Sequence, residues 1–162
     1  MLTQEKLKEL LHYDPFTGIF TRKIKQKHTA FKVGATSGCI ARGYVIIRIY
    51  NKTYQAHRLV WLYVYGKNPI ELIDHINTIR NDNCLCNLRE ATRTENAQNQ
   101  VKAVAGNKSG YLGVSWNKKS SKYIAQITVN GEKKGLGFFA DPKIAYQAYL
   151  KAKRELHPFC TL

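Results

Sequence analysis

The sequence has 162 residues, of which 44% are hydrophobic and 11% aromatic, so it has enough chain and apolar content to bury a core, which argues against a disordered tail. It holds 26 Lys and Arg against 11 Asp and Glu, a formal net charge of +15, and an excess of this size attracts polyanions such as nucleic acid. No stretch is apolar enough to span a membrane and the first residues lack the order of a secretory signal, so we expect a cytoplasmic protein.

The positive charge is concentrated toward the two ends of the sequence. Residues 1–56 and residues 104–162 each hold ten basic and three acidic groups, whereas residues 57–103 hold six and five. A protein that only binds nucleic acid needs the basic segments, but an enzyme that places a cation against phosphate also needs local carboxylates. The nearly neutral middle therefore favours an enzyme.

The N-terminal residues predict a helix and a turn. Residues 3–12 fit a short helix capped by Thr3, and the residues from Asp14 to Gly18 end it with a turn. Residues 19–38 are basic and irregular, with one possible short strand.

Next in the chain, a hairpin, a buried helix and two further strands are predicted. Residues 43–54 are β-branched and aromatic around a central Asn-Lys pair, which predicts a hairpin. Residues 56–65 are apolar nearly all round and precede a glycine, which predicts a buried helix. Residues 72–75 and 88–91 predict strands on either side of a loop rich in Asn and Asp, and residues 92–101 predict a polar helix.

The C-terminal residues predict a small module of three antiparallel strands and one helix. Residues 111–117 and 123–129 alternate between apolar and polar side chains, and Asn130-Gly131 is a strong signal for a two-residue hairpin turn. A third strand over 133–139 follows, and then Asp141 caps a helix with an apolar face.

The middle segment contains a set of residues suited to hydrolysis of a phosphodiester. Asp74 and His75 end a predicted strand, Asn87 lies twelve residues after His75, and Asn96 lies nine further on. A strand, loop, strand and helix of this length can fold back so that Asn96 faces the Asp-His pair. A carboxylate and an amide oxygen suit Mg²⁺ or Mn²⁺, and a neutral imidazole beside them can take a proton from water. One-metal hydrolysis needs no more than this set.

The segment around these residues resembles the HNH endonucleases of phage and intron origin. Its HRL, DHIN, NDN, NLR and EN motifs stand in the family's order and spacing, and the similarity covers roughly residues 43–100. The resemblance implies a ββα-metal site in which His75 is the general base, Asn87 braces the loop and orients His75, and Asp74 and Asn96 hold one divalent cation. At the last position of the HNH motif this sequence has Asn96, where the family's name-giving residue is histidine.

Structural interpretations exist for the same residues. Asp74 and Asn87 could cap turns, and His75 could be a hydrogen-bonded core histidine. Arg89 and Arg93 flank the site, where they either hold phosphate oxygens or are solvated surface charges.

Other groups in this part are interpreted as structural. His57 starts the buried helix and has no evident partner, which favours packing. Cys84 and Cys86 raise the question of zinc, but a four-cysteine site needs two separated pairs, and Cys39 and Cys160 would have to complete it from opposite ends of the chain. We therefore expect no zinc, and small buried thiols instead.

Residues 109–156 resemble the plant APETALA-two/ethylene-response DNA-binding domain, which also occurs fused to phage HNH nucleases. The matching features are the YxGV opening, the aromatic-x-A-x-I strand, the LGxF motif and the alanine-rich helix. In that family the sheet lies in the DNA major groove and the helix covers its other side. The plant domains carry arginines and tryptophans on the outer face, where this sequence has Leu112, Ser115, Asn117 and Gly135, so the plant target sequence does not transfer.

The two faces of the predicted sheet have different compositions. The apolar face is expected to pack on the helix with Val114, Trp116, Ala125, Ile127 and Leu136. The polar face and the lysines around it are expected to contact DNA, through Ser115, Asn117, Lys118, Lys119, Lys122, Gln126, Thr128 and Lys133. The alternative is a solvated face with no ligand.

Together these observations predict an α+β protein with a ββα-metal (HNH) nuclease core followed by a three-stranded antiparallel sheet packed on one helix. The predicted regions are a basic N-terminal region (1–42), the core (43–103) and a DNA-binding domain (104–162), with the last boundary in the small polar stretch 102–110. The expected function is cleavage of double-stranded DNA with one Mg²⁺ or Mn²⁺.

The duty that fits best is that of a phage homing endonuclease, acting in the host-cell cytoplasm as a monomer that nicks a recognised site. The resemblance implies products with 5′-phosphate and 3′-hydroxyl ends. Two alternatives remain: a nuclease of another duty with the same site, such as host-DNA degradation or packaging-related nicking, and a DNA-binding regulator whose nuclease core is vestigial.

Overall fold

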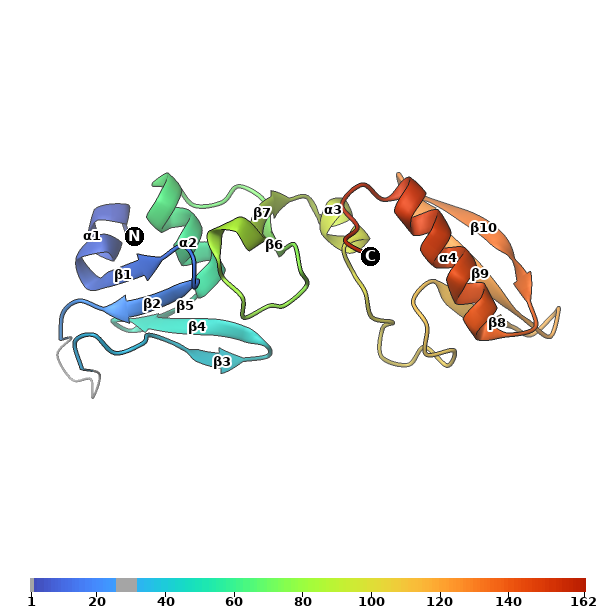
Figure 1. Cartoon of the computed structure of the whole chain (residues 1–162), viewed down its shortest axis with the longest axis horizontal. Helices are drawn as coiled ribbons and strands as arrows, with labels where there is room; N and C mark the ends of the chain where they lie inside the picture. Colours follow the sequence, from blue (N-terminus) through green and yellow to red (C-terminus); the bar gives the residue numbers. More distant parts are fainter. Residues whose placement is uncertain (1, 26–31) are drawn as a thin grey trace. The chain divides into compact units, whose positions relative to one another are not determined.

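The computed structural model describes residues 2–25 and 32–162, and the chain divides into two compact units, Met1–Thr92 and Arg93–Leu162 (Figure 1). Helices and antiparallel sheets occur in both units, which confirms the mixed α and β composition. The predicted region boundaries at 42/43 and 103/104 both fall inside a unit. Part of the predicted basic N-terminal region, residues 26–31, lies outside the described residues.

The first unit combines short helices with antiparallel strand pairs. Its elements are α1 (Gln4–Leu10), β1 (Leu11–Asp14), β2 (Ile19–Arg22), β3 (Cys39–Ala41), β4 (Tyr44–Ile49), β5 (Lys52–Gln55), α2 (Ala56–Tyr65), β6 (Leu72–His75), the 3-10 turn η1 (Leu85–Asn87) and β7 (Leu88–Ala91). The strands pair as β1–β2, β3–β4–β5 and β6–β7.

Local signals set most of these elements. The Thr3 hydroxyl accepts the Lys6 N–H at 3.3 Å and caps α1, as predicted, but the helix ends early because Leu11 is extended and begins β1. The predicted helix over 56–65 is α2 residue for residue, and it ends at Gly66 in the left-handed conformation, with φ of 72°. The predicted hairpin is formed by β4 and β5.

The N-terminal residues share one hydrophobic core with the rest of the first unit, which is why the predicted boundary at 42/43 does not exist. Leu7 and Leu10 of α1 and Phe20 of β2 are buried together with Ile47 of β4 and Val60 of α2. The hydrophobic face of α1 would stay exposed to water if the N-terminal region were a separate basic arm, so it is buried against the later elements.

The turn between β1 and β2 packs against the loop that follows β6. The Leu85 N–H donates to the Pro15 carbonyl at 3.0 Å, and the Tyr13 hydroxyl donates to the Asn83 carbonyl at 2.8 Å. Gly18 has a φ of 70°, and a Cβ there would lie 2.4 Å from the backbone of Asn83. Only glycine permits this close approach.

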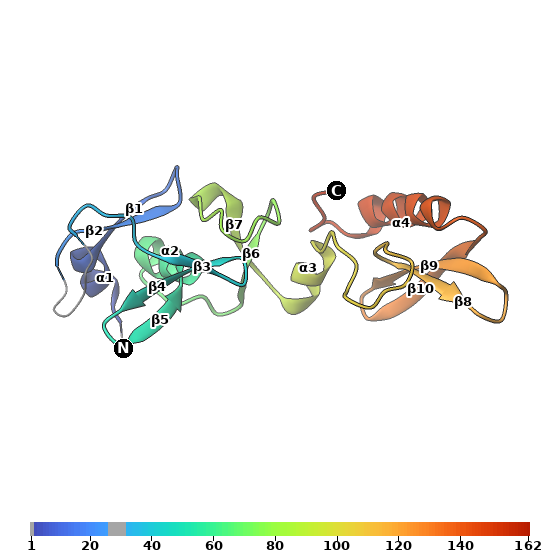
Figure 2. The same cartoon turned by 90° about the horizontal axis from the view of Figure 1, so that it is seen from below.

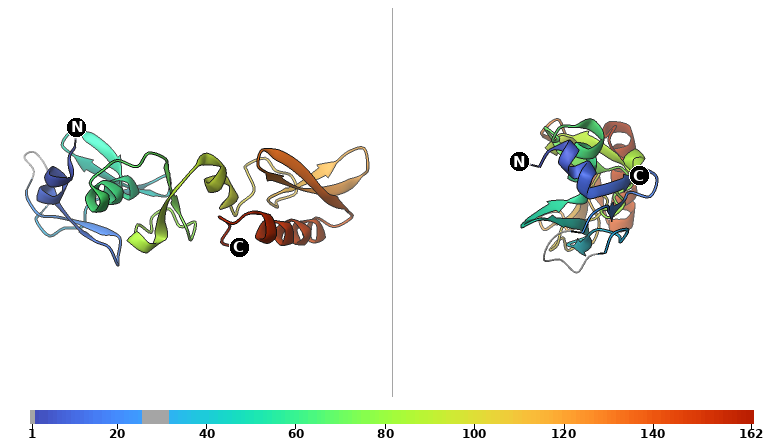
Figure 3. Two further views of the ribbon diagram at one scale, coloured as in Figure 1. Left: turned by 90° about the horizontal axis from the view of Figure 1, so that it is seen from above. Right: turned by 90° about the vertical axis from the view of Figure 1, so that its left-hand side faces the viewer.

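The second unit is a helix, a three-stranded sheet and a longer helix that covers the sheet. Its elements are α3 (Arg93–Gln98), β8 (Val114–Asn117), β9 (Lys122–Val129), β10 (Glu132–Phe139) and α4 (Pro142–Leu156). The strands pair in the order β10–β9–β8, all antiparallel, and α4 lies along one face of the sheet (Figure 2; Figure 3, left). The predicted three-stranded sheet packed on one helix is confirmed.

Turn and cap residues of the second unit are also as predicted. Asn130 and Gly131 both have positive φ, 52° and 86°, which the hairpin turn between β9 and β10 requires. The Asp141 carboxylate accepts the Lys143 N–H at 2.6 Å and caps α4, whose first residue is Pro142.

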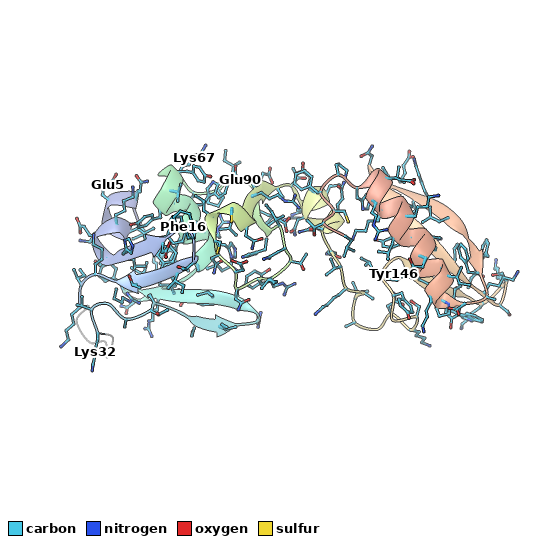
Figure 4. All side chains as sticks on the ribbon, viewed as in Figure 1. Glu5, Phe16, Lys32, Lys67, Glu90 and Tyr146 are labelled. Atoms are coloured by element: carbon cyan, nitrogen blue, oxygen red, sulfur yellow. The ribbon has the colours of Figure 1, made fainter. Side chains whose placement is uncertain are left out.

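The core of the second unit lies between the sheet and α4. Val114, Ala125 and Ile127 are buried with α4 residues such as Tyr149, and Leu136 packs against them. Tyr146 on the same helix, labelled in Figure 4, lies 5.0 Å from the Tyr111 ring.

The prediction for Trp116 is wrong. Its side chain is on the helix-facing side of the sheet but is 47% exposed, because it stands near the end of β8 and packs edge-to-face on Tyr123, with the ring centroids 4.9 Å apart.

Helix α3 is joined to the C-terminal end of the chain, which explains why the units divide at 92/93. None of its residues is buried. Three hydrogen bonds connect the residues at and after its end to α4 and the final residues: Lys153 Nζ to the Gln100 carbonyl, Phe159 N to Gln98 Oε1 at 3.4 Å, and Thr161 Oγ1 to Asn99 Oδ1 at 2.9 Å. The predicted helix over 92–101 is thus shorter, and its anchor lies about 60 residues away in sequence.

Across residues 2–25 and 32–162, no helix combines the length and the apolar character needed to cross a membrane.

Candidate active site

Asp74 and His75 are neighbours at the end of β6, where the sequence predicts them. The strand pairs with β7, so that Asp74 lies opposite Arg89 and His75 opposite Leu88. Both side chains are buried, at 6% and 4% exposure. A buried carboxylate beside a buried imidazole is costly unless both are hydrogen-bonded, so the surrounding residues must satisfy them.

Arg89 satisfies much of the charge of Asp74. Its Nε and Nη2 both donate to Oδ2 of Asp74, at 3.0 and 2.9 Å. The Arg89 side chain is 24% exposed and is paired with Asp74, and its predicted contact with phosphate oxygens stays a prediction. The ion pair holds the carboxylate in place on the strand next to His75.

Burial is the main influence on His75. It lowers the pKa of His75 below the usual 6.5, although a hydrogen bond to Asn83 and the charge of Asp74 act in the opposite direction. His75 Nε2 lies 3.3 Å from Asn83 Oδ1. An imidazole with a lowered pKa is neutral at neutral pH, which is the form that accepts a proton.

Asn87 holds the two ends of the loop after β6 together. Its Oδ1 accepts the Asn77 N–H at 2.9 Å, and its Nδ2 donates to the Asp82 carbonyl at 2.8 Å. Its own carbonyl accepts the Ile76 N–H at 2.9 Å. The bonds made by its side chain brace the loop, and its role in orienting His75 stays a prediction.

An aromatic cluster surrounds His75, and most of its members were not predicted. The His57 ring on α2 meets the His75 ring edge-to-face with 5.1 Å between centroids, and Tyr44 on β4 lies 6.0 Å from His75. The Arg80 guanidinium stands 5.1 Å above the Tyr44 ring. The packing interpretation of His57 is confirmed, and burial lowers its pKa to about 4.

Asn96 and Arg93 lie on α3, in the second unit. Arg93 is exposed and Asn96 is partly exposed. The order β6, loop, β7, α3 is the one that the sequence predicts, and the metal role of Asn96 and the phosphate role of Arg93 stay predictions.

The donors in the first unit fit a hard cation that keeps most of its water. Asp74 supplies one carboxylate, and the part of the chain that the structure describes contains no group of three or more His, Cys, Asp or Glu side chains that could hold a metal. Oxygen donors with water in the remaining positions are typical of Mg²⁺ and Mn²⁺.

The prediction of buried thiols is wrong. Cys39 and Cys86 are exposed, and Cys84 and Cys160 are partly exposed. Cys84 is held at the surface of the loop, where its thiol donates to the Phe16 carbonyl at 2.8 Å.

The sheet face opposite α4 contains the residues predicted to contact DNA. The strand register places Lys122, Gln126, Thr128 and Lys133 with Ser115 on this face, and all but the partly buried Gln126 are exposed. Lys118 and Lys119 are exposed in the turn between β8 and β9.

Asn117 has a structural role on this face. Its Oδ1 accepts the N–H groups of Lys119 and Ser120 at 3.0 and 3.1 Å, so it caps the turn between β8 and β9. Two apolar residues also lie on the face, Ile124 and the 52% exposed Phe138.

Comparisons with known proteins give a family match that lies mainly in the first unit and a structural match that extends over both units. No curated protein matches the chain. A solved structure described as DNA binding and cleavage by the HNH homing endonuclease I-HmuI is similar, with 24% sequence identity, a TM-score of 0.44, and coverage of 85% of this chain and 75% of that one. Residues 54–98 match the family described as HNH endonuclease, and this segment contains Asp74, His75, Asn87 and Asn96. Residues 54–98 are thus similar to HNH endonuclease domains, and this match supports a DNA endonuclease.

Proposed function

We propose that the chain cleaves double-stranded DNA in a metal-dependent reaction with His75 as the general base. The observation that carries the proposal is the buried Asp74–His75 pair at the end of β6, next to a loop that Asn87 braces through both ends of its amide. The pair lies inside the segment that matches the HNH endonucleases.

His75 is suited to take a proton from the attacking water. Because burial lowers its pKa, the imidazole is neutral at neutral pH and accepts the proton as the water oxygen bonds to phosphorus. The bond between phosphorus and the 3′ oxygen then breaks, and its electron pair stays on that oxygen, which solvent protonates. The products have 5′-phosphate and 3′-hydroxyl ends.

Asp74 and Asn96 are the residues that we propose to hold the cation, Mg²⁺ or Mn²⁺. HNH nucleases generally use a divalent metal ion. When bound, such an ion offsets the negative charge that grows on the phosphate and the leaving oxygen. Arg89 holds the Asp74 carboxylate in place on β6 through two hydrogen bonds, and Arg93 is available to phosphate from the exposed surface of α3.

The second unit is proposed to bind the DNA on the outer face of its sheet. The face carries exposed polar side chains and is surrounded by lysines. The sequence of this unit resembles the APETALA-two domain, in which the sheet lies in the DNA major groove. Lysines on such a face contact phosphates, and the side chains of Ser115, Gln126 and Thr128 offer hydrogen bonds to base edges. The proposed biological duty is that of a phage homing endonuclease.

We also propose that a monomer makes a nick. The chain offers one Asp-His pair with its Asn partners, and so one reaction centre per polypeptide. One centre cannot serve phosphates on both strands without rebinding.

A supercoiled plasmid with the target tests the proposed function. With Mg²⁺ or Mn²⁺, open circles should accumulate before linear DNA appears, and EDTA should stop the reaction. Direct conversion to linear DNA, with a rate that rises as the square of the enzyme concentration, would show a cooperating pair. DNA binding without cleavage under any metal condition would instead indicate a regulator with a vestigial nuclease core.

A further inference from the structure

Asn83 is a fully buried polar residue whose side chain faces the proposed general base. It is 2% exposed, and its Oδ1 lies 3.3 Å from Nε2 of His75. We propose that Asn83 is a positioning residue that fixes the tautomer of His75, so that Nε2 carries the proton and Nδ1 accepts the proton from water. The inference deepens the proposed function and, in its catalytic consequence, rests on it.

The orientation of the Asn83 amide follows from its second hydrogen bond. Its Nδ2 donates to the carbonyl of Asn81 at 3.3 Å, so the amide nitrogen faces a group that can only accept. The amide oxygen therefore faces His75. Since that oxygen can only accept, the ring nitrogen opposite it must be the donor, and neutral His75 is protonated on Nε2.

Contacts from the N-terminal hairpin hold Asn83 in place. The Tyr13 hydroxyl donates to its backbone carbonyl at 2.8 Å from a buried position. Gly18 lies against the peptide between Asn83 and Cys84, where any Cβ would come within 2.4 Å. The main chain of Asn83 is thus held by β1 and the following turn, and this places its side-chain oxygen next to Nε2 of His75.

The His75 ring is held from its other side by the aromatic cluster. The His57 ring meets it edge-to-face at an angle of 84°, and Tyr44 packs against both histidines. His57 is buried on α2, so it restricts rotation of the His75 ring. A ring that cannot flip presents the same nitrogen to Asn83 throughout.

The tautomer decides which atom does chemistry. As the O–H bond of the attacking water breaks, its proton goes to Nδ1 of His75, and the imidazolium that forms shares its Nε2 proton with Asn83 Oδ1. The hydroxide oxygen forms the new bond to phosphorus, and the electron pair of the breaking bond leaves on the 3′ oxygen. The amide dipole of Asn83 stabilises the positive ring in the transition state.

The first test is ¹⁵N NMR of the full chain with labelled histidine, in which the His75 signals are identified by their loss in His75→Gln. The wild type should show Nδ1 at the shift of an unprotonated nitrogen and Nε2 at that of a protonated one. Asn83→Leu should move both shifts toward the average of a mixed population, and Asn83→Asp, which keeps an accepting oxygen, should restore the Nε2-protonated form. A wild-type His75 protonated on Nδ1 would overturn the proposal.

Tyr13→Phe is a second variant that keeps the ring in the core and removes only the bond to the Asn83 carbonyl. It should move the His75 shifts in the same direction as Asn83→Leu, by a smaller amount, even if the leucine variant does not fold. Asn81→Ala, at an exposed position in the same loop whose backbone carbonyl is retained, is the control and should leave the shifts unchanged. Unchanged shifts in both Asn83→Leu and Tyr13→Phe would contradict the inference.

Kinetics then separates positioning from folding. At saturating DNA, Asn83→Leu should lower kcat about 10- to 100-fold with little change in KM, which is the usual effect of removing a residue that orients a site ligand or base, and Asn83→Asp should recover part of it. An equal loss in both variants would contradict a role through the accepting oxygen. If the wild type shows the expected tautomer and cleaves no DNA, the proposed function fails while the tautomer assignment stands.

Discussion

At the scale of single residues, the Asp74–Arg89 ion pair decides whether the site is stable. Nε and Nη2 of Arg89 both donate to Oδ2 of Asp74, which is 6% exposed. Removal of one partner of a buried pair leaves the other charge without compensation, which costs more than the pair contributes.

Arg89→Met should therefore lower the free energy of unfolding by about 3 kcal/mol, at the lower end of the range for broken buried pairs. Urea denaturation measures it, and Lys6→Met is the control, because the Lys6–Glu9 pair is exposed and its loss should have no measurable effect. Addition of Mg²⁺ should restore part of the loss if Asp74 binds the cation. Similar losses in the two variants would show that Arg89 does not compensate a buried charge.

His57 makes the stability of the first unit depend on pH. Burial lowers its pKa from 6.5 to about 4, so between these values the unfolded chain binds a proton that the folded chain does not. Stability should fall as the pH decreases through this window, by about 1.4 kcal/mol per pH unit for the one group.

His57→Phe should reduce this dependence, measured by urea denaturation at a series of pH values between 6.5 and 4. The substitution should not remove the pH dependence altogether, because burial also lowers the pKa of His75. His12→Gln, at an exposed position on β1, is the control. An unchanged slope in His57→Phe would show that His57 is not held neutral in the folded chain.

The sequence predicts part of the candidate site because part of it is local. Asp74, His75 and Asn87 lie in one short strand-loop-strand segment, and their side chains are arranged by its own turns and hydrogen bonds. Tyr44 could not be assigned, because it meets His75 only through the tertiary fold. Asn83 lies in the loop that follows His75, but its burial and position depend on Tyr13, which is 70 positions away.

At the scale of elements, successive residues of each strand in the β8–β10 sheet alternate between the outer face and the side that faces α4. Lys133 lies opposite Thr128 on the outer face, and the next residue, Lys134, lies opposite the buried Ile127 on the other. Both lysines are exposed, so they form a matched pair of equal charge.

Lys133→Ala should weaken DNA binding and lower the slope of log K against log salt by about one, because one phosphate contact is lost. Lys134→Ala should leave the slope nearly unchanged. Fluorescence anisotropy with labelled duplex DNA at several salt concentrations measures both. Equal slopes for the two variants would mean that the outer face does not meet phosphate.

Helix α3 is expected to depend on the end of the chain. A six-residue helix with no buried residues is not stable alone, and Lys153 Nζ donates to the carbonyl two residues past its end. Lys153→Met should speed hydrogen exchange of the α3 amides about tenfold or more, since a hydrogen bond to a charged group contributes about 1.5–3 kcal/mol. Lys151→Met, at an exposed position on α4 near Lys153, should leave the exchange of the α3 amides unchanged. Equal exchange in the two variants would exclude the anchor.

Most elements could be predicted because their signals are short in sequence. The cap of α1, the end of α2 at Gly66 and the Asn130-Gly131 turn all depend on neighbouring residues. The boundary between the units could not be predicted, because α3 is joined to residues about 60 positions later in the chain. Nor could the inclusion of the N-terminal residues in the first unit, because their leucines are buried against strands beyond residue 42.

At the scale of the whole molecule, the two units divide the proposed work. The first holds the buried Asp74–His75 pair within the HNH endonuclease match, and the second presents an open, lysine-rich sheet face. The net charge of +15 attracts polyanions, and the proposed chemistry is assigned to one residue.

We propose that His75 acts in the chemical step and not in DNA binding. The most direct test is to compare wild type and His75→Ala on the same duplex, with nicking rate and affinity measured in one preparation. The rate should fall by about 10²–10⁴-fold, the usual contribution of a general base, while the affinity stays nearly unchanged. Cleavage by His75→Ala within about tenfold of wild type would contradict the assignment.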